Sequence, residues 1–339
     1  MTRPLPSRSA AGTVLAAVGL LTLTACGSGV TEPEADGEGA DGRQPTVLAN
    51  CGRDIVLSGP PEAIVGLSPS QTELLLRLGL GDRMVGQAQT ATAPLPEDLR
   101  AEAEDIPVLS EDAPPTREVL LEAAPDFVFA PTAYEFTAEQ GFASIEQLDE
   151  AGVAAYIATG GCEDRRMTGT VDDLFTDLDT LGRALGAVEA AAGLAEEARA
   201  ALDDVAAGVS GQEPVTVAQV YVEGSTLSAI GAGIEYDIIG RAGGENVFGP
   251  GDAAFADFFA AQINPEVLAE RDPEALVFAV SGAEHERATR EYLESTFPDL
   301  DAVRNDRLIP ISSSDVYPGT LGNVDAVADI AAALYPGAF

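Results

Sequence analysis

The chain has no lysine and no tryptophan, and its 339 residues include one histidine and three cysteines. Without lysine it cannot carry the lysine of a phosphate-binding P-loop. A single histidine, His285, excludes a zinc motif built on two histidines, and the chain has no nucleophile-elbow serine motif. Pairs of carboxylates are so frequent in this acidic chain that they do not indicate a catalytic site. We therefore expect a protein that is not an enzyme.

Positively charged residues are also scarce. There are 56 acidic residues against 18 basic ones, all arginine, so the formal net charge is −38. A surface of this sign repels nucleic acid and anionic lipid, which excludes sequence-independent binding to either. The acidity is typical of a solvated surface and does not indicate a particular binding partner. With 46% hydrophobic residues the chain can bury a core, and its length suits two domains.

The first 25 residues have the pattern of an export signal. Arg3 and Arg8 precede an apolar stretch, 10–22, that is too short to span a bilayer, and LTAC (23–26) places a cysteine after small residues. This resembles a bacterial lipoprotein signal, which implies cleavage before Cys26, lipid on its thiol and an anchor at the outer face of the cell membrane. A plain secretory signal is the alternative. Residues 26–46 are rich in Gly, Pro and acid and predict a flexible tether.

The other two cysteines are Cys51 and Cys162. Export would place them in an oxidising compartment, where an even pair indicates a disulfide. Such a bond would close a loop of about 110 residues and stabilise the fold by roughly 4–5 kcal/mol on the chain-entropy model. Two separate buried thiols are the alternative.

Strand and helix patterns alternate over 47–168, which predicts an α/β lobe with a largely parallel sheet. A helix is expected to start at Ser70, because Ser70 and Glu73 have capping-box spacing. The other predicted helices cover 117–124 and 139–150. The predicted strands cover 54–57, 63–67, 83–87, 127–130 and 154–160.

The region 169–208 is predicted to be helical, with a second, Ala-rich helical stretch after Gly186 that runs to about Ala207. Leucines on one face of 170–186 predict an amphipathic helix, and about 17 residues at 1.5 Å each would reach roughly 25 Å, enough to cross between two lobes. Strand and helix patterns return over 209–339 and predict a second α/β lobe. Its predicted strands cover 215–224, 275–280 and 307–313, and its helices cover 233–244, 285–296 and 323–336.

One unit occurs in both predicted lobes. EVLLEAAPDFVFA begins at Glu118 and EVLAERDPEALVFA begins at Glu266. Each reads as a helix, a proline seven residues after the first Glu, an acidic residue and a buried strand. The pattern predicts that the same helix-stop-strand unit lies at an equivalent place in each lobe.

These two units, with the segments 64–87 and 233–248, resemble the class III solute-binding proteins of bacterial ABC transporters. The resemblance implies two α/β lobes joined by a single long helix, with the ligand in the cleft between the lobes. It also implies a partner, the ABC permease dimer, on which Glu118 and Glu266 would dock. The alternative for each Glu is simple stabilisation of a helix N-terminus. We expect a monomer that contacts the membrane only through its lipid.

Within that family, the lone histidine argues against bare zinc or manganese, which take several histidine ligands. We therefore expect a small-molecule metal chelate as ligand and no resident cofactor, with a ferric siderophore of the hydroxamate type favoured. Cobalamin, haem and a non-transport sensor role are the alternatives. Arg165 and Arg166 are the arginines expected near the cleft. The candidate ligand-binding residues are Ser68, Ser70, Gln87, Thr132, Tyr134, Phe136, Tyr221, Tyr236, Phe255, Phe258 and Tyr317.

Overall fold

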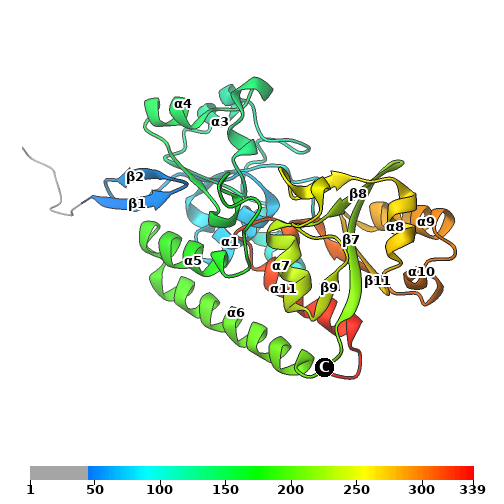
Figure 1. Ribbon diagram of the computed structural model, residues 1–339. Coiled ribbons are helices and arrows are strands. Elements are labelled where there is room, and N and C mark those ends of the chain that lie inside the picture. Colours follow the sequence, from blue (N-terminus) through cyan, green and yellow to red (C-terminus); the bar gives the residue numbers. More distant parts are fainter. Residues whose placement is uncertain (1–44) are drawn as a thin grey trace, which may run out of the picture. The chain divides into compact units, whose positions relative to one another are not determined.

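The computed structural model describes residues 45–339, which contain two α/β lobes (Figure 1). The predicted signal and Cys26 lie outside the described residues. The first lobe holds a four-stranded parallel sheet in the order β4-β3-β5-β6. Its strands are β3 (Ile64–Gly66), β4 (Met84–Gln87), β5 (Phe127–Ala130) and β6 (Ala154–Ile157). Its helices are α1 (Pro69–Arg77), α2 (Arg100–Ala103), α3 (Arg117–Glu122) and α4 (Ile145–Glu150). All of β5 is buried, as expected of a parallel strand covered on both faces.

Two helix starts in this lobe differ from prediction. Ser68 is the N-cap of α1, because Pro69 occupies the first turn, where its missing N–H costs nothing. The predicted capping box on Ser70 is therefore wrong, and the Ser70 hydroxyl lies 2.9 Å from that of Ser68. The helix predicted over 139–150 begins only at residue 145, because Ser144 and Gln147 form a capping box there.

A hairpin of β1 (Thr46–Asn50) and β2 (Arg53–Leu57) lies beside β6. Its two turn residues, Cys51 and Gly52, have φ of 49° and 74°, as a two-residue hairpin turn requires. The predicted Cys51–Cys162 disulfide is present, with its Cα atoms 5.2 Å apart. Asn50 donates to the Ile157 carbonyl (2.7 Å) and accepts from the Ile157 amide (3.0 Å). The hairpin is thus fastened to β6 covalently and by a paired hydrogen bond.

Two helices connect the lobes, as predicted for 169–208, but the second of them is the one that crosses. α5 (Asp173–Ala184) ends before Gly186, whose φ of 72° breaks the helix, and its leucine face is buried against the first lobe. α6 (Val188–Val209) then runs for 22 residues, about 33 Å, from α5 to the second lobe (Figure 1). The expectation that 170–186 alone would cross is wrong, and α6 is the long linking helix.

The second lobe holds a mixed sheet in the order β10-β8-β7-β11-β12, and β9 pairs with the start of β7. Its strands are β7 (Val215–Glu223), β8 (Thr226–Ile230), β9 (Gly244–Asn246), β10 (Ala260–Gln262), β11 (Ala275–Val280) and β12 (Leu308–Ser312). Its helices are α7 (Gly233–Arg241), α8 (Pro265–Arg271), α9 (Ala283–Thr296), α10 (Asp301–Arg304) and α11 (Gly322–Leu334). The three predicted strands, β7, β11 and β12, are neighbours that pair in parallel. The strands β8 and β10 pair antiparallel, are short and were not predicted.

The repeated unit has the same structure in both lobes. Each copy is a short helix, α3 or α8, followed by the fully buried strand β5 or β11. In each copy a residue with positive φ, Ala124 or Asp272, ends the helix directly before the proline. The predicted placement of one unit in each lobe is confirmed.

The acidic residue after each proline ties the unit to the first strand of its lobe. The Asp126 carboxylate accepts from the Glu62 and Ala63 amides at 2.8 and 3.0 Å, just before β3. The Glu274 carboxylate accepts from the amide and the hydroxyl of Thr216 in β7 at 2.9 and 3.0 Å. The repeat therefore joins two neighbouring parallel strands in the same way twice.

Candidate functional site

Loops at the carboxyl ends of the parallel strands form hydrogen bonds between the two lobes. The Gln71 amide at the start of α1 donates to the Pro318 carbonyl at 3.1 Å. The Ser313 hydroxyl donates to the Thr92 carbonyl at 3.1 Å. The Gly233 amide at the start of α7 donates to a first-lobe carbonyl at 3.2 Å. Ligands of open α/β sheets bind at this end of the strands, so the space between these loops is the candidate cleft.

The electrostatic surroundings of Tyr317 include groups from both lobes. Burial raises the pKa of its hydroxyl, and the charges of Glu135, Glu235 and Tyr134 raise that pKa further. Tyr317 in turn lies close enough to Tyr221 to act on its hydroxyl. Tyr134 and Glu135 come from the loop after β5, and the other three come from the second lobe. These five residues are termed the cleft cluster.

Tyr221 is held at the end of β7 by its neighbours. Burial, then Glu223 and Tyr317, raises the pKa of its hydroxyl to about 12, so the hydroxyl remains a donor at neutral pH. It donates to the Glu223 carboxylate at 2.9 Å. The His285 ring packs edge-on against it, with centroids 5.6 Å apart, and His285 Nε2 donates to the Val222 carbonyl at 2.8 Å. The lone histidine is thus partly buried and supports this tyrosine.

Glu135 is enclosed in the first lobe, with 5% of its surface exposed. Its carboxylate accepts from the Thr132 amide at 3.2 Å and from the Thr132 hydroxyl at 2.7 Å. Burial nevertheless raises the pKa of this carboxyl group, because desolvation outweighs these donors. Thr132, one of the predicted ligand-binding residues, is thus hydrogen-bonded to Glu135.

Glu235 is the corresponding carboxyl group of the second lobe, in the first turn of α7. The residue keeps some exposed surface, but its carboxyl group is enclosed and accepts from the side-chain amide of Gln219, which is fully buried. Burial raises the pKa of Glu235 to about 8, against the opposing effect of that donor. Neither carboxyl group was predicted, because in a chain with 56 acidic residues no sequence signal marks these two.

The two arginines expected near the cleft are engaged with other side chains. Arg165 forms an ion pair with Asp173 at 2.6 Å. The Arg166 guanidinium lies over the Phe258 ring, 5.4 Å from its centroid, so this predicted second-lobe residue meets the first lobe.

The remaining predicted ligand-binding residues lie within one lobe. Phe136 and Phe255 are 6% and 1% exposed and belong to the cores of their lobes. Ser68 and Ser70 are buried at the start of α1. The Gln87 amide donates to two backbone carbonyls, of Ala103 and Ile106, beside a pocket of about 360 Å³ in the first lobe. Tyr236 is 37% exposed and lies near Gly249. The cleft cluster does not use these side chains.

Comparison with known proteins places this architecture. The sequence profile of the family described as periplasmic binding protein matches residues 64–314, which cover both lobes and the linking helices. The chain belongs to the periplasmic binding protein family. The predicted fold class, two α/β lobes joined by a long helix, is confirmed.

Relatives of this periplasmic binding protein share about a fifth of its residues. A vitamin B12-binding protein of Vibrio campbellii (strain ATCC BAA-1116) is 22% identical over 273 residues, covering 80% of this chain and 89% of that protein. An uncharacterized ABC transporter substrate-binding lipoprotein of Bacillus subtilis (strain 168) is 22% identical over 287 residues, covering 85% of this chain and 84% of that protein. The match thus extends over most of each chain.

Solved structures share the fold of this periplasmic binding protein. One from Veillonella parvula, described as a periplasmic binding protein, has a TM-score of 0.76 at 21% identity, covering 86% of this chain and 98% of that one. One described as an ABC-type Fe³⁺-hydroxamate transport system, from Saccharomonospora viridis, has a TM-score of 0.71 at 24% identity, covering 86% and 99%.

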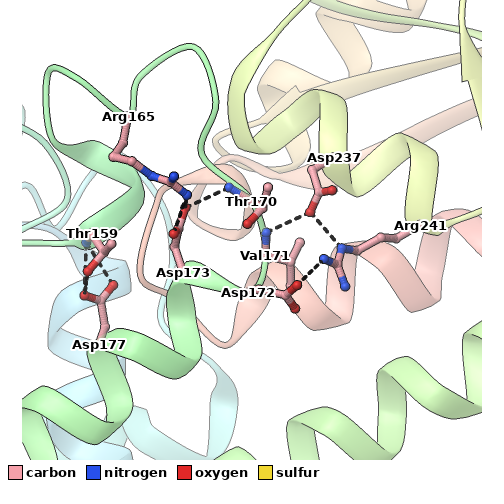
Figure 2. Close-up of polar contacts among 9 residues, drawn as sticks. All are labelled: Thr159, Arg165, Thr170, Val171, Asp172, Asp173, Asp177, Asp237 and Arg241. Carbon is pink, nitrogen blue, oxygen red and sulfur yellow. Dashed lines mark hydrogen bonds and ion pairs between the residues drawn. The ribbon is translucent and has the colours of Figure 1, made fainter.

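The start of α5 is a junction between the lobes of this binding protein, shown in Figure 2. The Arg241 guanidinium of α7 donates to Asp237 at 2.7 Å and to Asp172 at 2.8 Å. The Asp237 carboxylate also accepts from the Val171 amide at 2.8 Å. On the other side of the turn, Asp173 accepts from the Arg165 guanidinium of the first lobe at 2.6 Å and from the Thr170 amide at 2.8 Å. Both lobes are therefore fastened to one helix end.

Asp177 lies one turn further along α5 and is fully buried. Its carboxylate accepts from the Tyr156 hydroxyl at 2.8 Å and from the amide and hydroxyl of Thr159 at 3.0 and 2.6 Å (Figure 2 shows Thr159). Gly319 of the second lobe comes so close that a Cβ there would lie 2.9 Å from Asp177 Oδ2 and 2.5 Å from the Ala158 Cβ. Asp177 thus supports the loop after β6 where the lobes meet.

We expect the free energy of unfolding to fall as pH rises from 5 to 8. Burial raises the pKa of Asp177 and Asp315 to about 7 and that of Glu235 to about 8. The folded protein keeps these protons at a pH where the unfolded chain, with carboxyl pKa values near ~4, has released them. Their contribution is therefore lost as pH rises through 7 to 8, by about 2 kcal/mol or more in total. Urea denaturation at each pH measures it.

The matched pair for this prediction is Asp177→Asn and Asp179→Asn, which each replace one carboxyl group of α5 by an amide. Asp179 is exposed and paired with Arg183, so its replacement leaves the pH dependence unchanged. Asp177→Asn is expected to reduce the fall of the free energy of unfolding with pH, because it removes one of the three carboxyl groups with a raised pKa. A free energy of unfolding that stays constant or rises over this range would contradict the prediction.

The two glutamates of the repeated unit occupy equivalent exposed positions. Glu118 is in the first turn of α3 and Glu266 in the first turn of α8. The residue two positions later, Leu120 or Leu268, is buried in both copies and fixes the helix on its lobe. The helix backbone and the neighbouring Arg117, 3.2 Å away, hold the pKa of Glu118 below its usual range. Both carboxyl groups are accessible to a partner, and their docking role stays a prediction.

Proposed function

We propose that this protein is the extracytoplasmic substrate-binding lipoprotein of an ABC importer. It captures a ferric siderophore of the hydroxamate type between its lobes and delivers it to a permease dimer, while lipid on Cys26 anchors it at the outer face of the membrane. The observation that carries the proposal is the set of contacts between the strand-end loops of the two lobes, where Gln71 meets Pro318 directly after Tyr317 and Ser313 meets Thr92. Aromatic walls with a few hydrogen-bonding groups suit a large organic chelate.

The chemistry of the side chains supports a chelate over a bare ion. Within residues 45–339 no group of three or more His, Cys, Asp or Glu side chains is arranged to hold a metal ion. His285 is committed to the Ser281 and Val222 backbone. A chelate brings its own ligand shell, so the protein needs only to contact the organic surface.

The described part of the chain, residues 45–339, also contains no helix with the length and apolar character needed to cross a bilayer. The anchor that we propose is the lipid on Cys26, which lies outside those residues. Mass spectrometry of the N-terminal peptide of the exported protein tests it, since lipid on Cys26 adds the mass of acyl chains and Cys26→Ser removes it.

Cobalamin is the second candidate, because the relative from Vibrio campbellii is named as a vitamin B12-binding protein. Haem is a third chelate of suitable size. Native mass spectrometry of the purified full chain, offered a ferric trihydroxamate, cobalamin and haem in turn, separates them. Retention of the trihydroxamate supports the proposal, whereas retention of cobalamin or haem alone would replace the ligand and keep the transport role.

Replacing Tyr134 and Tyr317 together by alanine is expected to weaken binding of the retained chelate about tenfold or more, because two contact faces are removed from opposite lobes. Titration calorimetry measures the affinity. Tyr292→Ala is the control, since Tyr292 packs on Phe297 in the second lobe. Unchanged affinity in the double variant, with its thermal midpoint preserved, would reject the cleft assignment.

A further inference from the structure

A groove in the first lobe runs along one edge of the β1–β2 hairpin. It has a volume of about 480 Å³, and residues 54–57, four consecutive residues of β2, line one side. Successive side chains of a strand point to opposite faces, so consecutive residues line a common groove along the edge of their strand. The other side is formed by Asp149 and residues 152–154, at the end of α4 and the start of β6. The groove therefore lies at the amino ends of the parallel strands, opposite the candidate cleft.

This edge of β2 carries backbone groups that no other strand uses. The two-residue turn of the hairpin makes Asn50 and Arg53 a hydrogen-bonded pair, and bonded and non-bonded pairs alternate from there. Asp54 and Val56 therefore occupy non-bonded positions, where their N–H and C=O groups point away from β1. Among residues 45–339 no further backbone hydrogen bond involves these groups, and β2 pairs with no strand except β1. The edge is thus open along the groove.

The neighbouring edge of β6 is covered instead by side chains of the hairpin. Asn50 donates to and accepts from Ile157 at 2.7 and 3.0 Å, and Arg53 donates to the Ala155 carbonyl. These bonds join the hairpin to β6 near the turn, and the groove begins where they end. Open edges are normally protected by a basic side chain, a proline or a bulge. Residues 54–57 (DIVL) contain neither a basic side chain nor a proline, and their pairing with β1 is regular, so this edge stays accessible.

The surface beside the open edge is both apolar and acidic. Val56 is 63% exposed, and Val47, its cross-strand neighbour on β1, is 57% exposed. The groove is also lined by Asp54, Asp126 and Asp149, and among residues 45–339 none of these three forms an ion pair. No basic residue of the described chain lines the groove. A strand added here would meet an apolar side chain on its exposed face and negative charge within the groove.

We propose that β2 binds an extended segment of a partner protein as an additional strand, and that this segment alternates basic and apolar residues. Its backbone forms hydrogen bonds with Asp54 and Val56, and an apolar side chain packs on Val56. Its arginine or lysine side chains, on the other face, lie toward Asp126 and Asp149. Residues 54–57 extend over roughly 13 Å, so about four residues of the partner pair with them. This binding is independent of the cleft and of the ligand proposed for it.

Charge argues against the two occupants that this chain could itself supply. Residues 27–44 carry five acidic residues and one arginine, so an acidic groove repels them. A second copy that paired through the same edge would bring the acidic linings of two grooves together. The occupant is therefore a basic segment of another protein.

The test uses two peptides with the same side chains. One is an amidated hexapeptide of alternating arginine and valine with a fluorophore at its N-terminus, and the other has every backbone nitrogen methylated. Methylation keeps all the charges but removes the donors that pair with a strand edge. Fluorescence anisotropy with the purified full chain, at about 0.15 M salt, is expected to show that the unmodified peptide binds about tenfold more tightly or better. Both peptides feel the same attraction to a chain of net charge −38, so the difference measures strand pairing.

A proline substitution assigns the binding to this edge. Val56→Pro removes the N–H that faces the groove, and the hairpin is retained because that N–H takes no part in the pairing with β1. It should weaken binding of the unmodified peptide about tenfold, to the level of the methylated one. Val47→Pro is the matched control, because Val47 lies opposite Val56 and its N–H points to the other edge of the hairpin. The control should keep the wild-type affinity.

Several outcomes would overturn the proposal. Equal affinity of the wild-type protein for both peptides would do so, since charge alone would then explain the binding, and so would an equal loss in the Val56→Pro and Val47→Pro proteins. A wild-type dimer that Val56→Pro dissociates, measured by analytical ultracentrifugation, would make a second copy the occupant. Tighter peptide binding after deletion of residues 27–44, by about tenfold, would make that segment the occupant. The wild-type comparison needs no variant, so misfolding of a variant cannot obscure the result.

Discussion

Uptake of the ligand is expected to fall to about a tenth of the wild-type rate or less when Glu118 and Glu266 are both replaced by arginine. The two carboxylates are exposed, lie at equivalent positions of the repeated unit and come from different lobes. Two like charges related in this way fit a two-fold permease dimer, in which each meets the same cationic pocket. Reversal of charge turns both attractions into repulsions. Binding of the ligand itself should stay unchanged, because neither residue belongs to the cleft cluster.

The repeated unit provides a matched control for this experiment. Glu122 and Glu270 lie four residues further along the same two helices and are also exposed. Glu122→Arg with Glu270→Arg changes the net charge equally but moves the new charge away from the first turn. This control should transport normally. We would measure uptake in whole cells and the ligand affinity of the purified proteins by calorimetry. Together these two measurements test whether Glu118 and Glu266 dock on the permease.

Either unexpected result would be informative. Normal uptake in the Glu118→Arg, Glu266→Arg protein would reject docking by these residues, and intact binding would then favour a sensor role. Equal loss of uptake in the control would indicate a general effect of surface charge. A small loss of stability is expected in the test protein alone, because an arginine in the first helical turn meets the positive end of the helix dipole.

The second large effect is expected from Cys51→Ser with Cys162→Ser, which should lower the free energy of unfolding by roughly 4–5 kcal/mol on the chain-entropy model. The bond joins residues 111 apart in sequence, so its removal frees a long loop in the unfolded chain. Urea denaturation measures the loss.

Reductant provides the control for the disulfide prediction. It should destabilise the wild-type protein by a similar amount and leave the double variant unaffected. The folded hairpin should survive in the variant, because Asn50 still pairs with Ile157 on both its hydrogen-bonding groups. A loss below about 1 kcal/mol would show that the unfolded chain is already restricted in this region.

Much of the architecture followed from the sequence, because local patterns encode it. The buried strands β5 and β11 were predicted residue for residue, since a continuous apolar run bounded by proline has few other solutions. The repeated unit was also predicted, and its acidic residue has a structural role visible in hydrogen bonds in both copies. The Cys51–Cys162 bond followed from export and cysteine number.

Errors arose where a single residue decides between neighbouring solutions. Pro69 moved the start of α1 away from Ser70. The break at Gly186 was predicted, but α6 and not the stretch 170–186 crosses between the lobes. The short antiparallel strands β8 and β10 were missed, because three to five residues give too little period to recognise.

By itself, then, the sequence determined two α/β lobes, their order, the repeated strand-pairing unit and the disulfide. Only the tertiary structure decided which side chains meet in the cleft. Thr132, Tyr134 and Tyr317 had been selected as loop residues, whereas Glu135 and Glu235 could not be distinguished from the other acids. The physical reason is that secondary structure depends on neighbours in sequence. The pKa of a carboxyl group at a site depends instead on its desolvation and on partners about 100 residues away, which only folding brings together.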